Sequence, residues 1–326
     1  MNDGKEFSQL TQTALEKIES RLIEIIPESP RSLYDPIRYA LQAGGKRIRP
    51  LLTYLSSISD ESANWLAAAC AVELLHSFTL IHDDIMDNAD TRRGRQTVHI
   101  KYNVNSAILS GDTIVALAQE VLASGKYEFG DKMMSEFASG FRAVCEGQAY
   151  DKEFETSESV TLADYRNMID LKSAKLLELA AVLGNYSAGG KEVETIRTFT
   201  HHIGIAFQMM DDLLDLTAES ASLGKMIGGD ILEGKRTFLF ISALEKIASL
   251  NLRDEELLIR IRDRAATVED IPKAKDLFHS LGIIESAHTE IHTETLRANE
   301  ILKQIKHESL RSALLSYSNY LLRRTY

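Results

Sequence analysis

An all-α fold is the architecture that this sequence predicts, and three observations point to it. The five prolines are Pro27, Pro30, Pro36, Pro50 and Pro272, so none lies between positions 51 and 271. That long segment is rich in Ala, Leu, Glu and Ile, which favour helices, whereas proline would break them. Alternating strand-like runs are hard to find, and no Ser/Gly-rich linker interrupts the chain. We therefore expect residues 1–326 to form one all-helical domain.

Four helices can be placed from their apolar patterns. They are expected at residues 62–88, at 106–123, from Thr161 onward, and at 192–216. Thr161 and Asp164 resemble a capping box at the start of the third, with Asp in place of Glu. Residues 88–94 and the glycine-rich residues 223–234 are expected to be loops.

Composition excludes several classes of protein. The chain has 37 basic and 48 acidic residues, a net charge of −11, which argues against nucleic acid as a general partner. Two cysteines, Cys70 and Cys145, are too few for a disulfide framework, and we expect both to be buried. The N-terminus lacks a basic region followed by an apolar core, and no apolar run approaches ~20 residues. We expect no membrane span and a cytoplasmic location.

Two aspartate motifs of identical form are the main chemical signal. Residues 83–87 and residues 211–215 both read D-D-x-x-D within apolar stretches. On a helix, positions i and i+4 share a face, so the first and last aspartates of each motif project together. Such close carboxylates repel one another unless cations lie between them. If the two clusters face each other, they form an all-oxygen site suited to Mg²⁺ and to a polyphosphate.

Basic residues accompany the acidic ones. A single D-D-x-x-D can be a solvated helix end, and Arg92-Arg93 alone can be a surface loop. Arginine nevertheless has the planar fork that suits phosphate oxygens. In the segment 44–50, two glycines allow close approach of the backbone to a ligand, and Lys46 and Arg49 are three positions apart. Lys172, Lys225 and Lys235 are each typical of surface lysines when considered alone.

Taken together, these motifs resemble the trans-isoprenyl diphosphate synthase, or polyprenyl synthetase, family. The resemblance covers residues 44–236 and rests on segments in the family's order: GGKRIRP (44–50), ELLHSFTLIHDDIMD (73–87), RRG (92–94), GQ (147–148), LKSAKL (171–176), FQMMDDLLD (207–215), LGK (223–225) and GGDILEGKRT (228–237). It implies an all-helical isoprenoid synthase fold, a single-domain bundle of roughly ten or more helices around a central active-site cavity, and a homodimer. It also implies a Mg²⁺-dependent prenyltransferase of isoprenoid biosynthesis, with roughly three ions per active site. Such an enzyme condenses an allylic diphosphate with isopentenyl diphosphate.

The resemblance also implies a role for each matching residue. The Mg²⁺ ligands would be Asp83, Asp87 and Asp211, supported by Asp84 and Asp215. Contacts to the allylic diphosphate would come from Arg92, Lys172, Lys225 and Lys235. The isopentenyl diphosphate site would contain Lys46, Arg49, His76 and Arg93. Oxygens facing the cationic transition state would belong to Gln208 and to the Lys172–Ser173 pair, although the family often has Thr where this chain has Ser173.

No separate general base is evident in the motifs. The departing diphosphate itself is expected to take the proton that is lost after carbon–carbon bond formation. His76 and His82 are candidates for that role, but a buried, hydrogen-bonded histidine is the simpler interpretation of His82. His201 and His202 have no motif around them, and we expect them to be structural.

Product length in the family depends on side-chain bulk below the metal site. Phe78 and Thr79 lie five and four positions before Asp83, about one turn along the same helix. An aromatic residue followed by a small one resembles the geranylgeranyl (C20) pattern. Two aromatics would indicate a farnesyl (C15) synthase, and two small residues a longer-chain synthase. Alternatively, Phe78 is simply a core residue, and another helix forms the floor against which the growing product chain ends.

Two other functions remain open at this point. A non-catalytic regulatory subunit would be expected to lose one aspartate motif or the arginine pair, and this chain keeps them all. A class I terpene cyclase also ionises an allylic diphosphate with D-D-x-x-D and Mg²⁺. Such a cyclase needs no second diphosphate site, which makes the second motif and the Lys46/Arg49 group unexpected.

Overall fold

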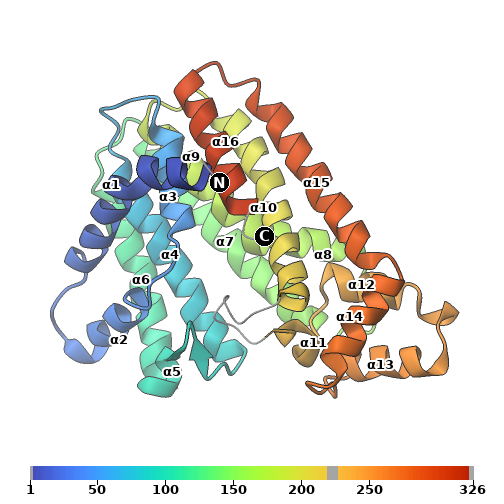
Figure 1. Ribbon diagram of the computed structural model, residues 1–326. Helices are drawn as coiled ribbons and strands as arrows, with labels where there is room; N and C mark the ends of the chain where they lie inside the picture. The colour runs from blue at the N-terminus through green and yellow to red at the C-terminus, as the bar shows by residue number, and fades with distance from the viewer. Residues whose placement is uncertain (1–2, 219–226, 323–326) are drawn as a thin grey trace. The chain divides into compact units, whose positions relative to one another are not determined.

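The protein is almost entirely helical (Figure 1). The computed structural model describes residues 3–218 and 227–322. Its α-helices are α1 (Asp3–Glu24), α2 (Arg31–Leu41), α3 (Ile48–Ser57), α4 (Trp65–Met86), α5 (Val98–Lys101), α6 (Val104–Ala123), α7 (Gly130–Phe154), α8 (Leu162–Ile169), α9 (Lys175–Ser187), α10 (Val193–Thr217), α11 (Gly229–Glu233), α12 (Phe238–Leu244), α13 (Leu252–Arg262), α14 (Asp270–Ser280), α15 (Ile283–Leu302) and α16 (Glu308–Leu322). The other elements are a π-helix, η1 (Asp170–Ala174), a 3₁₀ helix, η3 (Ile247–Ser249), and strands β1 (Thr91–Arg92) and β2 (Arg95–Gln96). The all-α prediction is confirmed.

The helices predicted at 62–88, 106–123 and 192–216 agree with α4, α6 and α10 to within a few residues at each end, and the helix predicted from Thr161 begins as α8 at Leu162. The Thr161 hydroxyl accepts the Asp164 N–H, and the Asp164 carboxylate accepts the Thr161 N–H, so the capping box is present at α8. The segment 88–94 is not wholly irregular, because β1 and β2 form a short antiparallel hairpin across Arg93 and Gly94. Within the described part of 223–234, residues 229–233 form α11.

The described chain divides into two compact units, each formed by separated segments. The first comprises Met1–Arg142, Leu176–Thr200 and Asn299–Leu321. Within it, α4 packs against α3, α6 and α1, and Figure 1 shows α4 and α6 side by side. Gly184 of α9 permits close packing on α3, because a Cβ there would lie 2.1 Å from the carbonyl oxygen of Thr53. This unit contains the first aspartate motif.

The second unit comprises Ala143–Lys175, His201–Ala298 and Leu322–Tyr326. Its apolar core is drawn from α8, the C-terminal part of α10, and α12 to α15. Tyr165, Phe240 and Phe278 are among its largest fully buried side chains. This unit contains the second aspartate motif. A single domain over residues 1–326 stays a prediction.

Two helices, α4 and α6, are long and apolar enough to cross a membrane by length and composition alone. Both have a mean hydropathy of 1.3 over an 18-residue window, and 61% and 50% of those windows are buried inside the protein. Core helices that pack against each other pass the same test, and α4 and α6 do pack together. Among the cysteines, Cys70 is buried, and burial raises the pKa of its thiol to about 12. Cys145 is exposed, so the expectation that both would be buried is wrong for Cys145.

Candidate active site

The first aspartate motif occupies the C-terminal end of α4. Asp83 and Asp87 are half-buried, and the Asp87 N–H donates to the Asp83 carbonyl at 2.8 Å as the helix ends. Because a helix C-terminus carries partial negative charge, carboxylates there are disfavoured unless cations are nearby. Asp84 points into the protein and is 4% exposed. The motif therefore separates two half-buried carboxylates from one buried carboxylate.

Asp84 is paired with an arginine from the following hairpin. The Arg92 Nε donates to the Asp84 Oδ1 at 2.7 Å. Burial raises the pKa of Asp84, and the nearby Arg92 guanidinium opposes that rise. Arg92, predicted to contact the allylic diphosphate, is thus fixed to the motif that is predicted to hold the metal ions.

The two basic segments, far apart in sequence, meet in the first unit. Arg93 has a left-handed backbone with φ of 53°, and its Nη1 donates to the carbonyl of Gly44. A Cβ at Gly45 would lie 2.8 Å from the Arg93 Nη1, so this glycine makes room for the guanidinium. Lys46, next in the chain, is exposed. The structure therefore brings the Gly44–Pro50 segment into contact with the hairpin of β1 and β2, which carries Arg92 and Arg93 and is called the arginine hairpin below.

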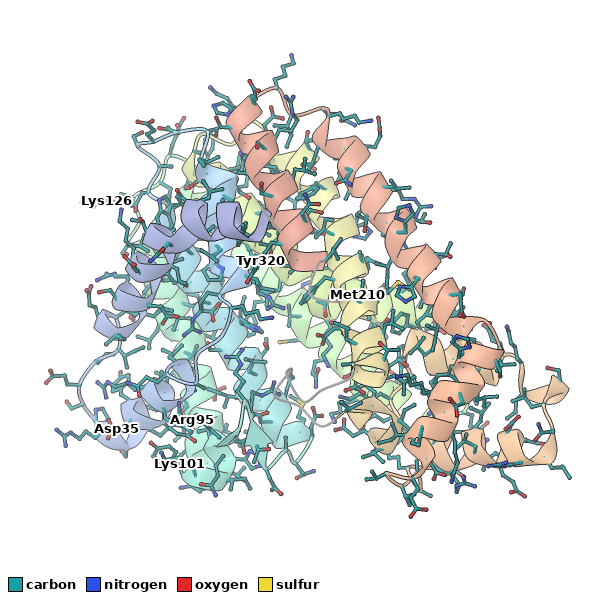
Figure 2. The ribbon with its side chains drawn as sticks, viewed as in Figure 1. Asp35, Arg95, Lys101, Lys126, Met210 and Tyr320 are labelled. Atoms are coloured by element: carbon teal, nitrogen blue, oxygen red, sulfur yellow. The ribbon has the colours of Figure 1, made fainter. Side chains whose placement is uncertain are left out.

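A tyrosine of α2 fixes the hairpin from the other side. The Tyr39 hydroxyl donates to the Gln96 carbonyl at 2.8 Å. The Arg95 Cζ and the Lys101 Nζ lie 4.2 Å and 3.8 Å from the centroid of its ring. Figure 2 labels Arg95 and Lys101 close to each other in this region. The Arg95 contact joins α2 to the hairpin that carries Arg92 and Arg93, and the Lys101 contact joins α2 to α5.

His76 lies beside these arginines on α4. Its Nε2 is 3.1 Å from the Arg49 Nη1, and because a guanidinium only donates, Nε2 must accept. Burial, and then Arg49 and Arg93, lower the pKa of His76 well below its usual value, so the ring is neutral and Nδ1 carries the proton. Nδ1 is buried and has no hydrogen-bond partner among residues 3–218 and 227–322. A buried donor of this kind calls for an acceptor.

Arg47, which the sequence analysis did not assign, has a structural role. It is 5% exposed, and its Nη1 donates to Glu73 at 2.6 Å while its Nε donates to Glu19 at 2.7 Å. Burial opposes its charge, but the two glutamates outweigh burial and raise its pKa. A cavity of about 40 Å³, room for one or a few waters, lies between Arg47, Glu73, Asp84 and the arginine hairpin.

The second aspartate motif lies in the C-terminal part of α10. Asp211 and Asp215 are half-buried, whereas Asp212 is 9% exposed. The Tyr165 hydroxyl donates to the Asp212 Oδ2 at 2.7 Å, and the Gln208 Nε2 donates to Oδ1 at 2.8 Å. Burial raises the pKa of Asp212, and the carboxylates of Asp230 and Asp211 raise it further. As in the first motif, the middle aspartate is the buried one.

Helix α11 is attached to the last aspartate of the second motif. The backbone N–H of Asp230 donates to the Asp215 Oδ2 at 3.0 Å, and the Gly228 N–H donates to the Asp215 carbonyl at 2.7 Å. The Lys235 Nζ lies 3.4 Å from Asp230 and 2.8 Å from Glu233. Burial disfavours the Lys235 ammonium, but these two carboxylates outweigh burial and raise its pKa. Lys225 lies outside the described residues.

Lys172 and Ser173 lie in the π-helix η1. Glycines allow this wide turn to pack tightly, because a Cβ at Gly147 would lie 2.3 Å from the Lys172 nitrogen and one at Gly204 would lie 2.6 Å from the Ala174 Cα. π-helical turns are frequent at functional sites. The Lys172 Nζ donates to the Asp151 Oδ2 at 2.5 Å.

Ser173 connects the π-helix to the second motif. Its Oγ donates to the Gln208 Oε1 at 2.5 Å. The structure thus brings together Ser173 and Gln208, which the sequence analysis placed beside the cationic transition state on resemblance alone. Asp151, which holds Lys172, also acts electrostatically on Lys235. Lys172 and Lys235, two of the predicted allylic lysines, therefore interact with the same carboxylate.

Phe78 and Thr79 occupy the turn of α4 below the first motif. Phe78 is 9% exposed, its ring centroid is 5.3 Å from that of Phe141 in an edge-to-face contact, and it is 4.5 Å from the His82 ring. His82 in turn fills the space beside Gly111, where a Cβ would lie 2.2 Å from its Nε2. The Thr79 hydroxyl donates to the His76 carbonyl at 2.8 Å. Phe78 is thus part of an aromatic cluster below the first motif.

Four residues that contact the predicted site residues carried no predicted role: Asp151, Tyr165, Asp212 and Asp230. Asp212 and Asp230 lie within segments already recognised as motifs, so their position was visible but their role was not. No sequence signal pointed to Tyr165 or Asp151. His201 and His202, expected to be structural, pair with Asp170 at 2.8 Å and Glu294 at 2.6 Å.

Comparison with known proteins places the chain in a family. The model of the polyprenyl synthetase family matches residues 30–278. The chain belongs to the polyprenyl synthetase family. A geranylgeranyl diphosphate synthase of Methanosarcina mazei is 34% identical over 95% of both chains, and a geranylfarnesyl diphosphate synthase of Natronomonas pharaonis is 33% identical over 95% of this chain and 96% of its own.

Solved structures agree with this assignment. A geranylgeranyl pyrophosphate synthetase from Pyrococcus horikoshii has a TM-score of 0.90 at 32% identity, covering 99% of this chain and 100% of its own. A polyprenyl synthase from Caulobacter crescentus, crystallised with calcium and isoprenyl diphosphate, has a TM-score of 0.89 at 25% identity, covering 99% and 98%. The chain is therefore a polyprenyl synthase, a prenyltransferase with the all-α isoprenoid synthase fold.

Proposed function

We propose that this polyprenyl synthase condenses an allylic diphosphate with isopentenyl diphosphate, head to tail, to give all-trans geranylgeranyl diphosphate. One observation carries the proposal: α4 and α10 each end in a motif whose first and last aspartates are half-buried while the middle one is buried on a partner. The names of the relatives support the C20 product. A regulatory subunit is disfavoured because both motifs and their basic partners are intact.

The half-buried aspartates fit Mg²⁺. Carboxylate oxygens are the ligands that hard divalent cations prefer, and the first motif places two of them at the negative end of a helix. Asp83, Asp87 and Asp211 would be ligands, with Asp215 in support, and roughly three ions would be bound. Asp84 would support the site indirectly, by holding Arg92 at 2.7 Å. When bound, Mg²⁺ stabilises negative charge on a leaving diphosphate.

The basic residues of the first unit would hold isopentenyl diphosphate. Lys46, Arg49 and Arg93 supply positive charge, and the buried Nδ1–H of neutral His76 supplies a donor for a diphosphate oxygen. Glycines 44 and 45 keep the backbone close to that oxygen. This clamp would hold the homoallylic double bond near the reacting carbon.

The second unit would hold the allylic substrate and its cation. Lys172, Lys225 and Lys235, with Arg92, would neutralise the allylic diphosphate. Cleavage of the C1–O bond leaves an allylic cation, faced by the oxygens of Ser173 and Gln208. The double bond of isopentenyl diphosphate attacks this cation and forms the new C–C bond. The resulting tertiary cation loses a proton to the released diphosphate, which restores a double bond.

Product length would be limited by Phe78. Its ring is buried against Phe141 and lies about one turn before Asp83 on α4. We expect Phe78→Ala to open the floor and lengthen the main product beyond C20, measured by chromatography of the dephosphorylated products. Tyr127→Phe, a change outside the floor, is the control. An unchanged C20 distribution would assign the floor to another helix, and a C15 or C25 main product from the unaltered enzyme would correct the proposed chain length.

A direct assay separates this function from that of a terpene cyclase. Purified protein is incubated with Mg²⁺ and each allylic primer, with and without isopentenyl diphosphate. A prenyl synthase forms longer diphosphates only when isopentenyl diphosphate is present. Consumption of the allylic substrate alone, with formation of a cyclic hydrocarbon, would contradict the proposal.

We further propose a homodimer located in the cytoplasm. Ile100, Val104, Ile108 and Leu109, on α5 and α6, are between 41% and 58% exposed. Apolar side chains gathered on neighbouring helices are typical of a protein interface, and a second copy of this chain is the occupant we expect. Sedimentation analysis tests it: Leu109→Glu would shift the protein to the monomer, whereas a monomeric unaltered protein would rule the dimer out.

A further inference from the structure

We propose that Tyr165 is a positioning residue of the active site, which acts through Asp212 to fix the orientation of the Gln208 side-chain amide. The inference rests on the proposed function, because it concerns the oxygen that would face the allylic cation. Tyr165 lies on α8, outside every motif that carries the family resemblance. Its effect would reach the reaction through two hydrogen bonds.

The hydrogen bonds form a chain with a defined direction. The Tyr165 hydroxyl donates to the Asp212 Oδ2 at 2.7 Å, the Gln208 Nε2 donates to the Asp212 Oδ1 at 2.8 Å, and the Ser173 Oγ donates to the Gln208 Oε1 at 2.5 Å. The end of the Gln208 amide that faces Asp212 is therefore the NH₂ group. Its carbonyl oxygen is then turned toward Ser173 and the π-helix.

The direction of this amide matters chemically. The oxygen and the NH₂ group of a glutamine are nearly equal in size, so neighbours decide which one occupies a given place. An oxygen facing an allylic cation stabilises the positive charge, whereas an NH₂ group in the same place repels it. Asp212 selects the orientation, and Tyr165 holds Asp212 as an acceptor.

Tyr165 itself is held firmly. It is 2% exposed, and burial, followed by the neighbouring Asp212, raises the pKa of its hydroxyl well above the usual value, so the proton stays on the oxygen that donates to Asp212. The next residue, Arg166, is paired with the buried Glu294 of α15, which also binds His202 of α10. A phenylalanine in place of Tyr165 would fill the same space without the hydroxyl. The hydroxyl is therefore the part of this side chain that the packing of the core does not require.

A double-mutant cycle separates positioning from simple packing. The four proteins are the unaltered enzyme, Tyr165→Phe, Gln208→Ala and the double variant. For Tyr165→Phe we expect kcat to fall about 10- to 100-fold, the size of effect of one misplaced stabilising group, while KM for each substrate stays within about twofold. In the Gln208→Ala background, Tyr165→Phe should cause no further loss, because the amide that it orients is gone.

Controls keep the outcome interpretable. Tyr127→Phe removes another buried hydroxyl, one that has no hydrogen-bond partner among the described residues, and should leave kcat unchanged. Circular dichroism and the unfolding midpoint establish that each variant is folded at the assay temperature. If Tyr165→Phe is too unstable, Asp212→Asn takes its place in the cycle, with the same expected non-additivity.

Two results would overturn the inference. One is an unchanged kcat for Tyr165→Phe, and the other is an equal fractional loss in both backgrounds, which would make Tyr165 a packing residue only. Failure of the proposed function would look different, because the unaltered enzyme itself would then form no condensation product.

Discussion

In the first aspartate motif, the buried middle residue, Asp84, accepts a hydrogen bond from the guanidinium of Arg92. In the second motif, the equivalent residue, Asp212, accepts from two neutral groups, the Tyr165 hydroxyl and the Gln208 amide. Both helices turn their first and last aspartates away from the middle one, as the i, i+4 spacing dictates. The spacing therefore determines which carboxylates are buried, and the neighbouring segments determine what the buried one does.

This difference assigns the two middle aspartates to different tasks. Asp84 holds a cation that is proposed to bind a diphosphate, so its influence should appear in substrate binding. Asp212 holds an amide that is proposed to face the carbocation, so its influence should appear in turnover. The outer aspartates, by contrast, are proposed to share one task, the binding of Mg²⁺.

The largest expected effect concerns these outer aspartates. We expect Asp83→Ala and Asp211→Ala each to lower kcat by about 10³-fold or more, because each removes a ligand of the cations that stabilise the leaving group. Steady-state assays over a range of Mg²⁺ concentrations measure this. Asp131→Ala, which changes an exposed aspartate of α7, is the matched control. Near-normal turnover of either variant would remove that motif from the metal site.

The next effect concerns the support of α8, which carries Tyr165. Glu294 is fully buried and binds Arg166, His202 and Arg297. Burial raises its pKa, but His202 and Arg166 outweigh burial and lower it from 4.5 to about 2. A carboxyl whose pKa is lower in the folded state stabilises the fold above the unfolded pKa, and the benefit is lost as pH falls from about 4.5 toward 2. The shift corresponds to about 3 kcal/mol at pH 7.

The variant Glu294→Gln tests whether the charge of Glu294 stabilises the fold. We expect its free energy of unfolding to be about 3 kcal/mol lower than that of the unaltered protein at pH 7, with the difference shrinking below pH 4. Urea unfolding at several pH values measures both. Glu300→Gln on the same helix, where the side chain is 70% exposed, should change stability little. A difference that does not depend on pH would mean that packing, not charge, accounts for the loss.

A smaller effect distinguishes the two middle aspartates directly. We expect Asp84→Asn to raise KM for the allylic substrate about 10-fold, the typical contribution of a charge-assisted hydrogen bond, with little change in kcat. Asp212→Asn should lower kcat and leave KM nearly unchanged. Initial rates with each substrate varied in turn give both constants. The same pattern of KM and kcat in both variants would mean that the two aspartates do not differ in task.

Parts of this arrangement could be predicted from the sequence, and the reason is local periodicity. The helix at α4, the capping box at Thr161 and the faces of both motifs follow from residues a few positions apart. The Tyr165–Asp212 and Arg93–Gly44 contacts join residues 47 and 49 positions apart, and only the packing of helices brings them together. The π-helix likewise depends on Gly147 and Gly204, which lie on other helices. Tertiary contacts of this kind leave no periodic signal.

The smallest expected effect is an absence of pH dependence at His76. Burial and the neighbouring arginines lower its pKa well below 6.5, so the ring stays neutral from pH 6 to pH 8. We expect His76→Ala to raise KM for isopentenyl diphosphate about 10-fold through loss of the Nδ1–H donor. The ratio of the KM of His76→Ala to the KM of the unaltered enzyme should be constant from pH 6 to pH 8.

Protonation of the substrate affects both KM values equally, because both enzymes bind the same diphosphate, so it cancels in this ratio. A protonated His76 would attract the diphosphate more strongly as the pH falls through 6.5, and its removal would then cost more at pH 6 than at pH 8. A ratio that grows threefold or more toward pH 6 would therefore show a charged histidine. In that case the arginines around His76 would not control its charge, and the first unit would bind isopentenyl diphosphate with a pH switch that the second unit lacks.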